Sequence, residues 1–260
     1  MSFQSNQGIW YYQFENLGDN LTQAVFTRRG GLSPHPWAAL NLGGTVGDEP
    51  QRVRENRRLA LMALGCDPES VYDVWQVHSV NVAIAEAARP PGKPYLQADI
   101  ILTDRPGITL MMRFADCVPI LLHDPVHKII GIAHAGWIGT VNGIARIAVE
   151  AMQVHFDSKP DDILAAIGPS IGPDHYIVGP DVVLQARQAF GQDASNLLGE
   201  RAGAIYFDLW AANRLTLEQA GVKQIEMADL CTACHTEDWY SHRAEAGRTG
   251  RFGAIIALNS

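Results

Sequence analysis

Between residues 98 and 135 the chain carries four short apolar runs in close succession, and this spacing constrains the fold more than any other feature. Short apolar and β-branched runs bounded by turn residues are typical of buried strands. The segment Asp124-Pro125-Val126-His127 leaves room only for a tight turn between two of them, so we expect adjacent strands to be antiparallel. The predicted strands are Ala98–Thr103, Ile108–Phe114, Pro119–His123 and Ile129–His134.

Elements on either side of this region complete a mixed pattern. Further strands are predicted at Val71–Val77, Ile163–Ile167 and Ala254–Leu258. Helical periodicity predicts helices at Gln51–Leu64, Thr140–His155, Pro180–Phe190 and Asp208–Ala220. Thr140 and Asp208 are suitable N-caps, and Gly221 is a suitable stop signal after the last helix. The pattern predicts an α+β fold with mixed sheets covered by helices on their outer faces.

The length of the chain allows a large core in one unit. A chain of 260 residues buries roughly 70–75% of the surface that it exposes when unfolded. We find no internal repeat, low-complexity segment or long linker, and the Pro/Gly cluster at residues 89–94 is typical of a surface loop. We therefore expect a single domain spanning residues 1–260, and a monomer.

Charge argues against nucleic acid and membrane partners. The chain has 20 Lys+Arg against 28 Asp+Glu, a net charge of −8, with no basic run. Its longest apolar stretches, such as Ile129–Ala135, are far too short to span a membrane. The first eight residues lack the basic and apolar regions of a signal peptide, so we expect a cytoplasmic protein. In a reducing compartment its four cysteines are ligands, nucleophiles or core residues rather than cross-links.

Cys117 and His134 are the first candidates for a functional site, because each lies at an end of an apolar run. If these strands are neighbours, the thiol and the imidazole meet at one end of the sheet. Gly136 and Gly139 follow in the next turn, where free backbone N–H groups and small residues let a ligand approach closely.

A Cys–His pair of this kind has two functional interpretations. It can be a nucleophilic dyad, in which the imidazole lowers the thiol pKa. It can also belong to a metal site with a third ligand and an open position for water, and His78, which also follows a strand-like run, is the natural third ligand. The structural alternative is a buried cysteine beside a hydrogen-bonded histidine, and the spacing of the three residues matches no local metal motif.

The segment Cys231-Thr-Ala-Cys234-His235 is a sharper local pattern. A C-x-x-C-H sequence is compatible with haem attachment, half a zinc site or a redox pair. Haem attachment normally requires export, a structural zinc requires two more ligands, and no second C-x-x-C exists in the chain. We therefore favour a structural or supporting role. The remaining histidines show no grouping with other candidate ligands and are interpreted as ordinary residues: His35, His123, His127, His155 and His175.

Polar residues near these motifs supply candidate substrate contacts. Asp116 can orient a ligand, position a substrate or cap a turn. Three C-terminal arginines, Arg243, Arg248 and Arg251, stand beside Gly and Thr in a pattern suited to phosphate or carboxylate, although a solvated loop gives the same pattern.

Eight motifs in order give the chain a specific resemblance that spans roughly residues 22–258. They are Thr27-Arg-Arg-Gly-Gly-Leu-Ser33, Leu40-Asn-Leu-Gly43 with Val46-Gly-Asp48, Gln76-Val-His-Ser79, Ala115-Asp-Cys-Val-Pro119, His134-Ala-Gly-Trp137, Ile167-Gly-Pro-Ser-Ile-Gly-Pro173, Cys231-Thr-Ala-Cys234 and Thr249-Gly-Arg251. The chain resembles the YfiH-type laccase-domain family, also known as polyphenol oxidase or peptidoglycan editing factor proteins.

The resemblance implies a fold, a metal and a reaction. The fold is a four-layer α/β/β/α arrangement, and the metal, usually zinc with copper as the alternative, is held by two histidines and a cysteine that correspond to His78, Cys117 and His134. The implied reaction is phosphorolysis of adenosine, inosine and methylthioadenosine to the free base and ribose 1-phosphate, with adenosine deamination alongside. Copper-dependent phenol oxidation and a role in correcting peptidoglycan precursors have also been attributed to the family.

The implied chemistry assigns roles to individual residues. A three-ligand zinc lowers the pKa of its bound water towards about 7, as deamination needs, and Asp116 is the candidate for proton transfer beside Cys117. Arg243 and Arg251 suit the phosphate, and the amides of Asn41 and Gln76 suit ribose hydroxyls or a base edge. A metal-free Cys117–His134 hydrolase and a non-enzymatic cell-wall protein with a structural zinc remain alternatives.

Three positions depart from the usual family pattern. Ile138 and Ala244 stand where arginine is frequent, and the stretch Asp174-His-Tyr-Ile177 stands where Cys and Glu are frequent. None is a proposed metal ligand, so the departures bear on substrate preference.

Overall fold

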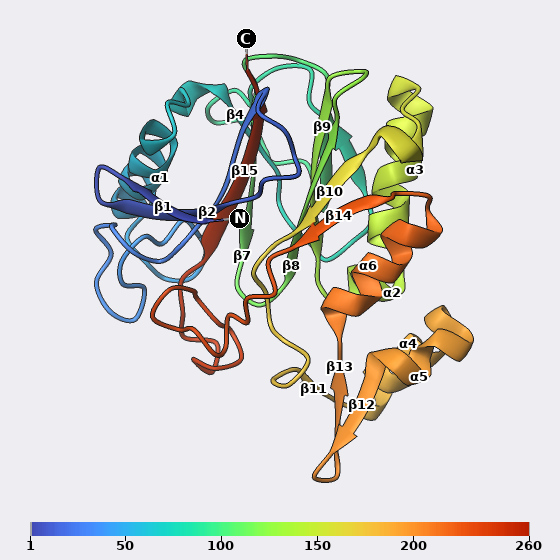
Figure 1. Cartoon of the computed structure of the whole chain (residues 1–260). Coiled ribbons are helices and arrows are strands. Elements are labelled where there is room, and N and C mark those ends of the chain that lie inside the picture. The colour runs from blue at the N-terminus through green and yellow to red at the C-terminus, as the bar shows by residue number, and fades with distance from the viewer. Residues whose placement is uncertain (1, 260) are drawn as a thin grey trace.

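The computed structural model describes residues 2–259 and contains two six-stranded sheets (Figure 1). The first sheet has the order β1-β2-β3-β15-β7-β4, and only β4 and β7 pair in parallel. Its strands are β1 (Ser2–Asn6), β2 (Ile9–Gln13), β3 (Leu21–Phe26), β15 (Phe252–Leu258), β7 (Thr109–Phe114) and β4 (Val71–Asp73).

The second sheet has the order β14-β10-β8-β9-β6-β5, with parallel pairs at both edges. Its strands are β14 (Gln224–Met227), β10 (Leu164–Ile167), β8 (Val118–Asp124), β9 (Ile129–Ala135), β6 (Ile100–Thr103) and β5 (Val82–Ile84). A small antiparallel sheet contains β11 (Ile177–Val178), β13 (Ala204–Phe207) and β12 (Leu198–Arg201). The predicted α+β class with mixed sheets is confirmed.

In Figure 1, helices lie at the outer sides of the two large sheets, and others lie beside the small sheet at the lower right. They are α1 (Pro50–Ala63), α2 (Trp137–Val141), α3 (Ile144–Phe156), α4 (Pro180–Phe190), α5 (Ala194–Leu197) and α6 (Leu209–Gln219), with short 3-10 turns at Pro68–Ser70, Pro160–Asp162 and Gly191–Asp193. Within residues 2–259, none of the helices combines the length and the apolar character that crossing a membrane requires.

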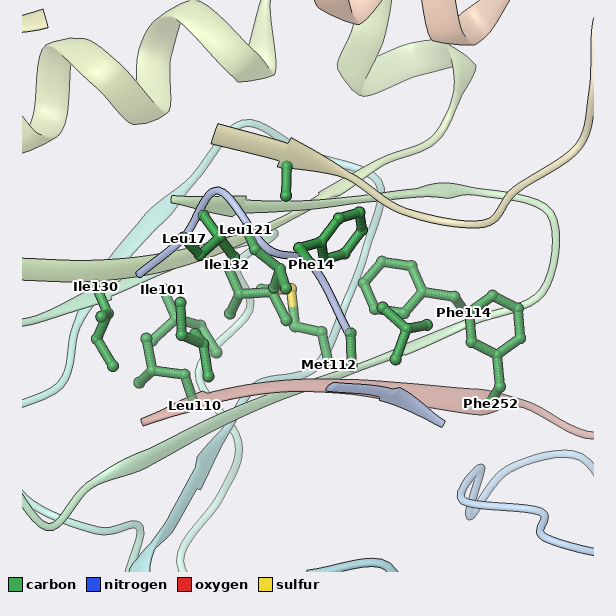
Figure 2. Close-up of a cluster of buried hydrophobic side chains, with 14 of the residues drawn as sticks. Phe14, Leu17, Ile101, Leu110, Met112, Phe114, Leu121, Ile130, Ile132 and Phe252 are labelled. Carbon is green, nitrogen blue, oxygen red and sulfur yellow. The ribbon is translucent and has the colours of Figure 1, made fainter. Parts of the chain in front are cut away.

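The apolar side chains form three buried clusters that follow the alternation of the strands. In β7, Leu110 and Met112 belong to the cluster shared by the two large sheets, which Figure 2 shows, while Met111 points to the cluster that includes α1. In β8, Leu121 belongs to the shared cluster, while Ile120 packs into the cluster that contains α3 and α6. The central strands β7 and β8 are thus apolar on both faces, as strands buried between two layers must be.

Several predicted elements differ from the observed ones in their bounds. The helix predicted at Thr140–His155 is two helices, because the chain turns at Gly143, which has a φ of +74°. Thr140 is therefore not an N-cap; its buried hydroxyl accepts a hydrogen bond from Asn213 Nδ2. The strand predicted at Val71–Val77 ends at Asp73. Asp208 caps α6 as predicted, since its side chain accepts from the Ala211 N–H.

Candidate metal centre and its pocket

Cys117 and His134 meet at one end of the second sheet. Strands β8 and β9 are antiparallel neighbours, with Val118 opposite Ala135, so the residue before β8 lies beside the end of β9. His134 is buried, and Cys117 is half-buried. The expectation that these two strands are neighbours is confirmed.

His78 reaches the same place from a loop between the two large sheets. This loop leaves β4 in the first sheet and leads to β5 in the second. His78 Nε2 lies 3.9 Å from Cys117 Sγ, and its ring centroid lies 5.0 Å from that of His134. One ligand atom from each of His78, Cys117 and His134 falls within 4.8 Å of the other two. The structure therefore brings the three predicted ligands together.

A buried carboxylate, Asp99, holds both histidines in place. Its Oδ1 lies 2.8 Å from His134 Nδ1, while its Oδ2 accepts hydrogen bonds from the backbone N–H groups of Val77 and Ser79, which flank His78, and from the Ser79 hydroxyl. The contact at Nδ1 leaves Nε2 of His134 as the nitrogen that could bind a metal. A carboxylate behind a histidine is the usual support of a metal ligand, because it fixes the tautomer and the ring orientation.

Sequence interpretation missed Asp99, although it stands at the start of a predicted strand. The available signal was a lone carboxylate at the edge of the apolar run Ala98–Thr103.

The electrostatics of the pair favour a thiolate. Burial opposes ionisation of Cys117, but the charge of His134 and the hydrogen bonds from His134 and His78 outweigh it and lower the pKa of Cys117 to about 6. Burial likewise opposes the imidazolium of His134, but the Cys117 thiolate and Asp99 outweigh it and raise its pKa to about 9. A thiolate is the form of cysteine that binds metal and that acts as a nucleophile.

The donor set and the space around it fit a divalent ion. Bonds of about 2.3 Å to sulfur and about 2.0–2.1 Å to nitrogen place tetrahedral ligand atoms about 3.5 Å apart, close to the observed 3.9 Å between His78 and Cys117. Gly136 keeps this space open, since a Cβ there would lie 2.9 Å from His78 Cδ2 and 3.1 Å from Cys117 Sγ. Three protein ligands leave one tetrahedral position for water or substrate.

Two residues of this site have left-handed backbone conformations. The φ angle is +59° at His78 and +78° at Asp116. Such conformations cost of order 1 kcal/mol or more at non-glycine residues and persist only where surrounding contacts hold them. At Asp116 those contacts are the hydrogen bonds that Oδ1 accepts from Thr232 Oγ1 and that Oδ2 accepts from the Arg243 N–H.

The three candidate ligands line a cavity of about 830 Å³ that is rich in arginine. Its wall also includes Asp116, Tyr176 and Gln76, and its five arginines are Arg54, Arg57, Arg113, Arg243 and Arg251. The guanidinium hydrogen bonds of Arg243 go to Ile177 O, and those of Arg251 go to the carbonyls of Thr249 and Gly250. Within residues 2–259 no carboxylate pairs with these two guanidinium groups, so both charges are available to an anion.

Asn41 does not line this cavity, which corrects its prediction as a substrate contact. The side chain is fully buried, and all four of its hydrogen-bonding positions are used. Nδ2 donates to Gly43 O and Asp48 Oδ2, while Oδ1 accepts from the N–H groups of Gly43 and Arg251. Asn41 therefore fixes the backbone of Arg251, whose N–H donates to its Oδ1, without contacting the cavity.

Gln76 lines the cavity, but its amide is held by the backbone of Arg113. Oε1 accepts from the Arg113 N–H at 2.9 Å, and Nε2 donates to Arg113 O at 2.8 Å. The Gln76 amide, which was predicted to bind ribose hydroxyls or a base edge, thus makes its two hydrogen bonds to the backbone of Arg113. One N–H of the amide is left for a ligand.

The Cys231–Cys234 segment lies in a second group of candidate ligands, with Asp174 and His175. The prediction that His175 has no grouping with other candidate ligands is therefore wrong. The side chains that lie beside the two cysteines come from a different loop rather than from a second C-x-x-C motif.

The chain is similar in sequence to a known protein family and to named relatives. Residues 22–259 match the family model described as multi-copper polyphenol oxidoreductase laccase. A protein of Deinococcus radiodurans named purine nucleoside phosphorylase is 42% identical over 235 residues, which cover 90% of this chain and 88% of that protein. Purine nucleoside phosphorylase YlmD of Bacillus subtilis is 36% identical, with 89% and 86% covered.

Solved structures match over almost the whole chain. The crystal structure of YlmD from Geobacillus stearothermophilus has a TM-score of 0.93 at 34% identity and covers 99% of both chains. That of the hypothetical protein YfiH from Bacillus licheniformis has a TM-score of 0.92 at the same identity and coverage. On these matches, the chain belongs to the YfiH/YlmD laccase-domain family.

Proposed function

We propose that this protein is a purine nucleoside phosphorylase that uses a zinc ion held by His78, Cys117 and His134. Its substrates are adenosine, inosine and methylthioadenosine, and its products are the free base and ribose 1-phosphate. The names of the relatives at 33–42% identity support the reaction class. One observation in the structure carries the proposal: the cavity with the three candidate ligands is lined by five arginines.

Phosphorolysis explains why such a cavity is cationic. An oxygen of phosphate attacks C1′ of the ribose while the C1′–N9 bond breaks, and the base leaves with the bonding electrons and takes up a proton. Guanidinium groups bind phosphate in a bidentate manner and stabilise negative charge in a partly dry site. Arg243 and Arg251 are the proposed phosphate ligands, because no carboxylate of the described residues pairs with their guanidinium groups.

The other end of the substrate requires an aromatic surface and a proton carrier. The ring of Tyr176 lies in the cavity wall with the Arg243 guanidinium 5.1 Å from its centroid, so it is the proposed stacking surface for the purine. Asp116, the residue before Cys117, is the proposed proton carrier. Thr232 and the backbone of Arg243 fix its carboxylate in the cavity wall.

The metal accounts for the proposed adenosine deaminase activity. A zinc ion with an open position supplies a water of lowered pKa and Lewis acidity. The chain contributes the three ligands, the Asp99 carboxylate that orients two of them, and Asp116 for proton transfer to the leaving ammonia.

Copper-dependent phenol oxidation is the second candidate, and the description of the family model favours it. A Cys and two His also match the trigonal ligands of a blue-copper site. Multi-copper oxidation needs several linked copper sites, whereas the cavity holds one group of three ligands. A metal-free Cys117–His134 thiol hydrolase, including one that edits peptidoglycan precursors, gives no role to the His78 imidazole that lies 3.9 Å from Cys117 Sγ.

We also propose the layer order helix–sheet–sheet–helix and a single domain over residues 1–260. The order is supported by the three apolar clusters, and the single domain by the pairing of β15 with β3 and β7. A monomer in the cytoplasm, where the ligand thiols stay reduced, completes the proposal.

The test is an assay of the zinc-loaded protein with adenosine, with and without phosphate. We expect adenine and ribose 1-phosphate only with phosphate, and inosine under both conditions. Oxygen uptake with a phenol is measured in parallel on zinc-loaded and copper-loaded protein. Release of adenine that does not depend on phosphate, or phenol oxidation without any nucleoside turnover, contradicts the proposal.

A further inference from the structure

A second group of candidate ligands lies next to Tyr176, outside the site described above. His175 Nδ1 is 3.8 Å from Cys231 Sγ, 3.5 Å from Cys234 Sγ and 2.9 Å from Asp174 Oδ1. One ligand atom from each of the four residues falls within 4.8 Å of the other three. Two sulfurs, a nitrogen and an oxygen therefore surround a common centre.

We propose that Asp174, His175, Cys231 and Cys234 bind a structural zinc ion. In a tetrahedral zinc site, a nitrogen and a sulfur ligand are about 3.5 Å apart, which is close to both observed distances from His175 Nδ1. Asp174 Oδ1 lies 2.9 Å from His175 Nδ1, whereas an oxygen and a nitrogen ligand of a tetrahedral zinc ion are about 3.4 Å apart. The side chains of Asp174 and His175 are both exposed at the surface, so they can move by the few tenths of an ångström that coordination requires.

The backbone around Cys231 supports a bound thiolate. The Gly172 N–H donates to Cys231 Sγ at 3.2 Å. A Cβ at Gly172 would lie 3.1 Å from that sulfur and 2.9 Å from Asp174 Oδ1, so only glycine leaves this space open. Gly172 thus leaves room for the sulfur and donates a hydrogen bond to it.

A metal accounts for the group better than a disulfide between the two cysteines. All four cysteines of the chain are free thiols in the structure. A disulfide makes no use of the imidazole and the carboxylate that a distant loop places beside the sulfurs. Thiolate and imidazole ligands with one carboxylate match the preferences of zinc.

The ion would join two loops that form the wall of the arginine-rich cavity. One loop carries His175 and, directly after it, Tyr176. The other carries Thr232, between the two cysteines, whose hydroxyl donates to Asp116 Oδ1 at 2.7 Å. The proposed zinc thus fixes the spacing between Tyr176 and Asp116 without touching the substrate.

The experiment counts metal in chelator-treated protein that is reloaded with zinc and dialysed. We expect about two zinc ions per chain for the unchanged protein, one in each site. The double variant Cys231→Ser/Cys234→Ser should retain about one, and so should Cys117→Ser. Cys66→Ser, which removes a thiol outside both groups, is the matched control and should retain two.

Cobalt reloading identifies which site remains, because each thiolate–cobalt bond adds near-ultraviolet charge-transfer absorbance. Cys117→Ser should keep about twice the absorbance of the double variant, since two thiolates remain against one. The zinc count and the cobalt absorbance of Cys117→Ser alone test the second site even if the double variant does not fold. If only the second site binds zinc, the unchanged protein and Cys117→Ser should each hold one zinc ion. The experiment therefore distinguishes failure of the proposed active-site zinc from failure of the second site.

The second site is overturned if Cys117→Ser binds no zinc, or if a folded double variant still binds as much as the unchanged protein. A Cys231–Cys234 disulfide that persists in denatured protein under non-reducing conditions, with no zinc in Cys117→Ser, overturns it as well.

Discussion

Asp99 Oδ1 lies 2.8 Å from Nδ1 of His134, and the other oxygen of the same carboxylate binds the backbone on both sides of His78. One buried side chain thus orients two candidate ligands that are 56 residues apart in sequence. The carboxylate is also ionised: burial opposes this, but the hydrogen bond and charge of His134 outweigh it and lower the pKa of Asp99. We therefore expect the metal affinity of the site to depend on Asp99 as well as on the three candidate ligands.

Replacing Asp99 by Asn should weaken zinc binding by about 10–100-fold, the usual effect of losing a carboxylate behind a ligand. The amide still accepts from Ser79, so the loop is preserved while the negative charge behind His134 is lost. Affinity is measured by competition with a chromophoric chelator. Asp104→Asn, a half-exposed residue just after the same strand, is the control and should bind as before; equal affinity in both variants contradicts the role of Asp99.

Gly136→Ala should also reduce zinc affinity, but through crowding. The added Cβ would lie 2.9 Å from His78 Cδ2 and 3.1 Å from Cys117 Sγ, so at least one ligand must shift. Gly139→Ala is a matched control one turn later, because its Cβ meets Ile144 at 3.4 Å and the carbonyl oxygen of His134 at 3.6 Å, which are ordinary contacts. Calorimetric titration with zinc should show about a tenfold or larger loss for the first variant only. Unchanged binding in Gly136→Ala would place the metal elsewhere.

Arg251→Gln should raise the KM for phosphate far more than the KM for adenosine. A hydrogen bond to a charged group contributes about 1.5–3 kcal/mol, which corresponds to about 10–100-fold. Arg248→Gln removes an exposed arginine of the same loop that does not line the cavity, so its kinetics should be unchanged. If the two variants behave alike, Arg251 does not bind phosphate.

Asp73 should stabilise the fold in a manner that depends on pH. Burial opposes its ionisation, but Arg113 at 2.6 Å, Arg89 at 2.8 Å and Arg57 outweigh this and lower the pKa of Asp73 below 3.8. Its contribution is therefore complete above the unfolded value and is lost as pH falls through the lower, folded value. Asp73→Asn should cost about 3 kcal/mol at neutral pH in urea unfolding, with the difference closing below about pH 4.

The control for this measurement is Asp161→Asn, which breaks an exposed pair with Lys223. Exposed pairs contribute about 0–1 kcal/mol, so this variant should remain close to the unchanged protein at every pH. If the loss of unfolding free energy in Asp73→Asn stays the same below about pH 4 as at neutral pH, the carboxylate charge is not its source.

The parts of the site that lie on predicted strands could be anticipated from sequence. Apolar runs and a tight turn were enough to place Cys117 beside His134, because antiparallel neighbours joined by a short turn have a fixed register. His78 was predicted because it follows the strand-like run Val71–Val77 and because the family resemblance includes it. The strand ends at Asp73 instead, and His78 lies in a loop between the two sheets.

The roles of Asn41 and Gln76 could not be predicted in this way. Sequence shows that an amide is present, but it does not show which backbone groups the amide satisfies. Both amides are occupied by main-chain atoms of residues far away in the sequence, at Arg251 and Arg113.

The grouping of His175 with the two cysteines depends on the pairing of β10 and β14. These parallel strands lead to adjacent loops, which meet at the bridge between Ser170 and Cys231. No strand was predicted at Gln224–Met227, because its four residues are too few for their alternation of polar and apolar side chains to stand out. Without that strand, nothing in the sequence placed the two loops side by side.

The most direct test of the account is the phosphate-dependent release of adenine from adenosine by one protein sample in two states, first stripped by chelator and then reloaded with zinc. The account predicts loss of activity in the stripped state and recovery near one equivalent of zinc in the active site, with no recovery in Cys117→Ser. Full phosphate-dependent activity in the stripped protein, or in the reloaded Cys117→Ser variant, would contradict it.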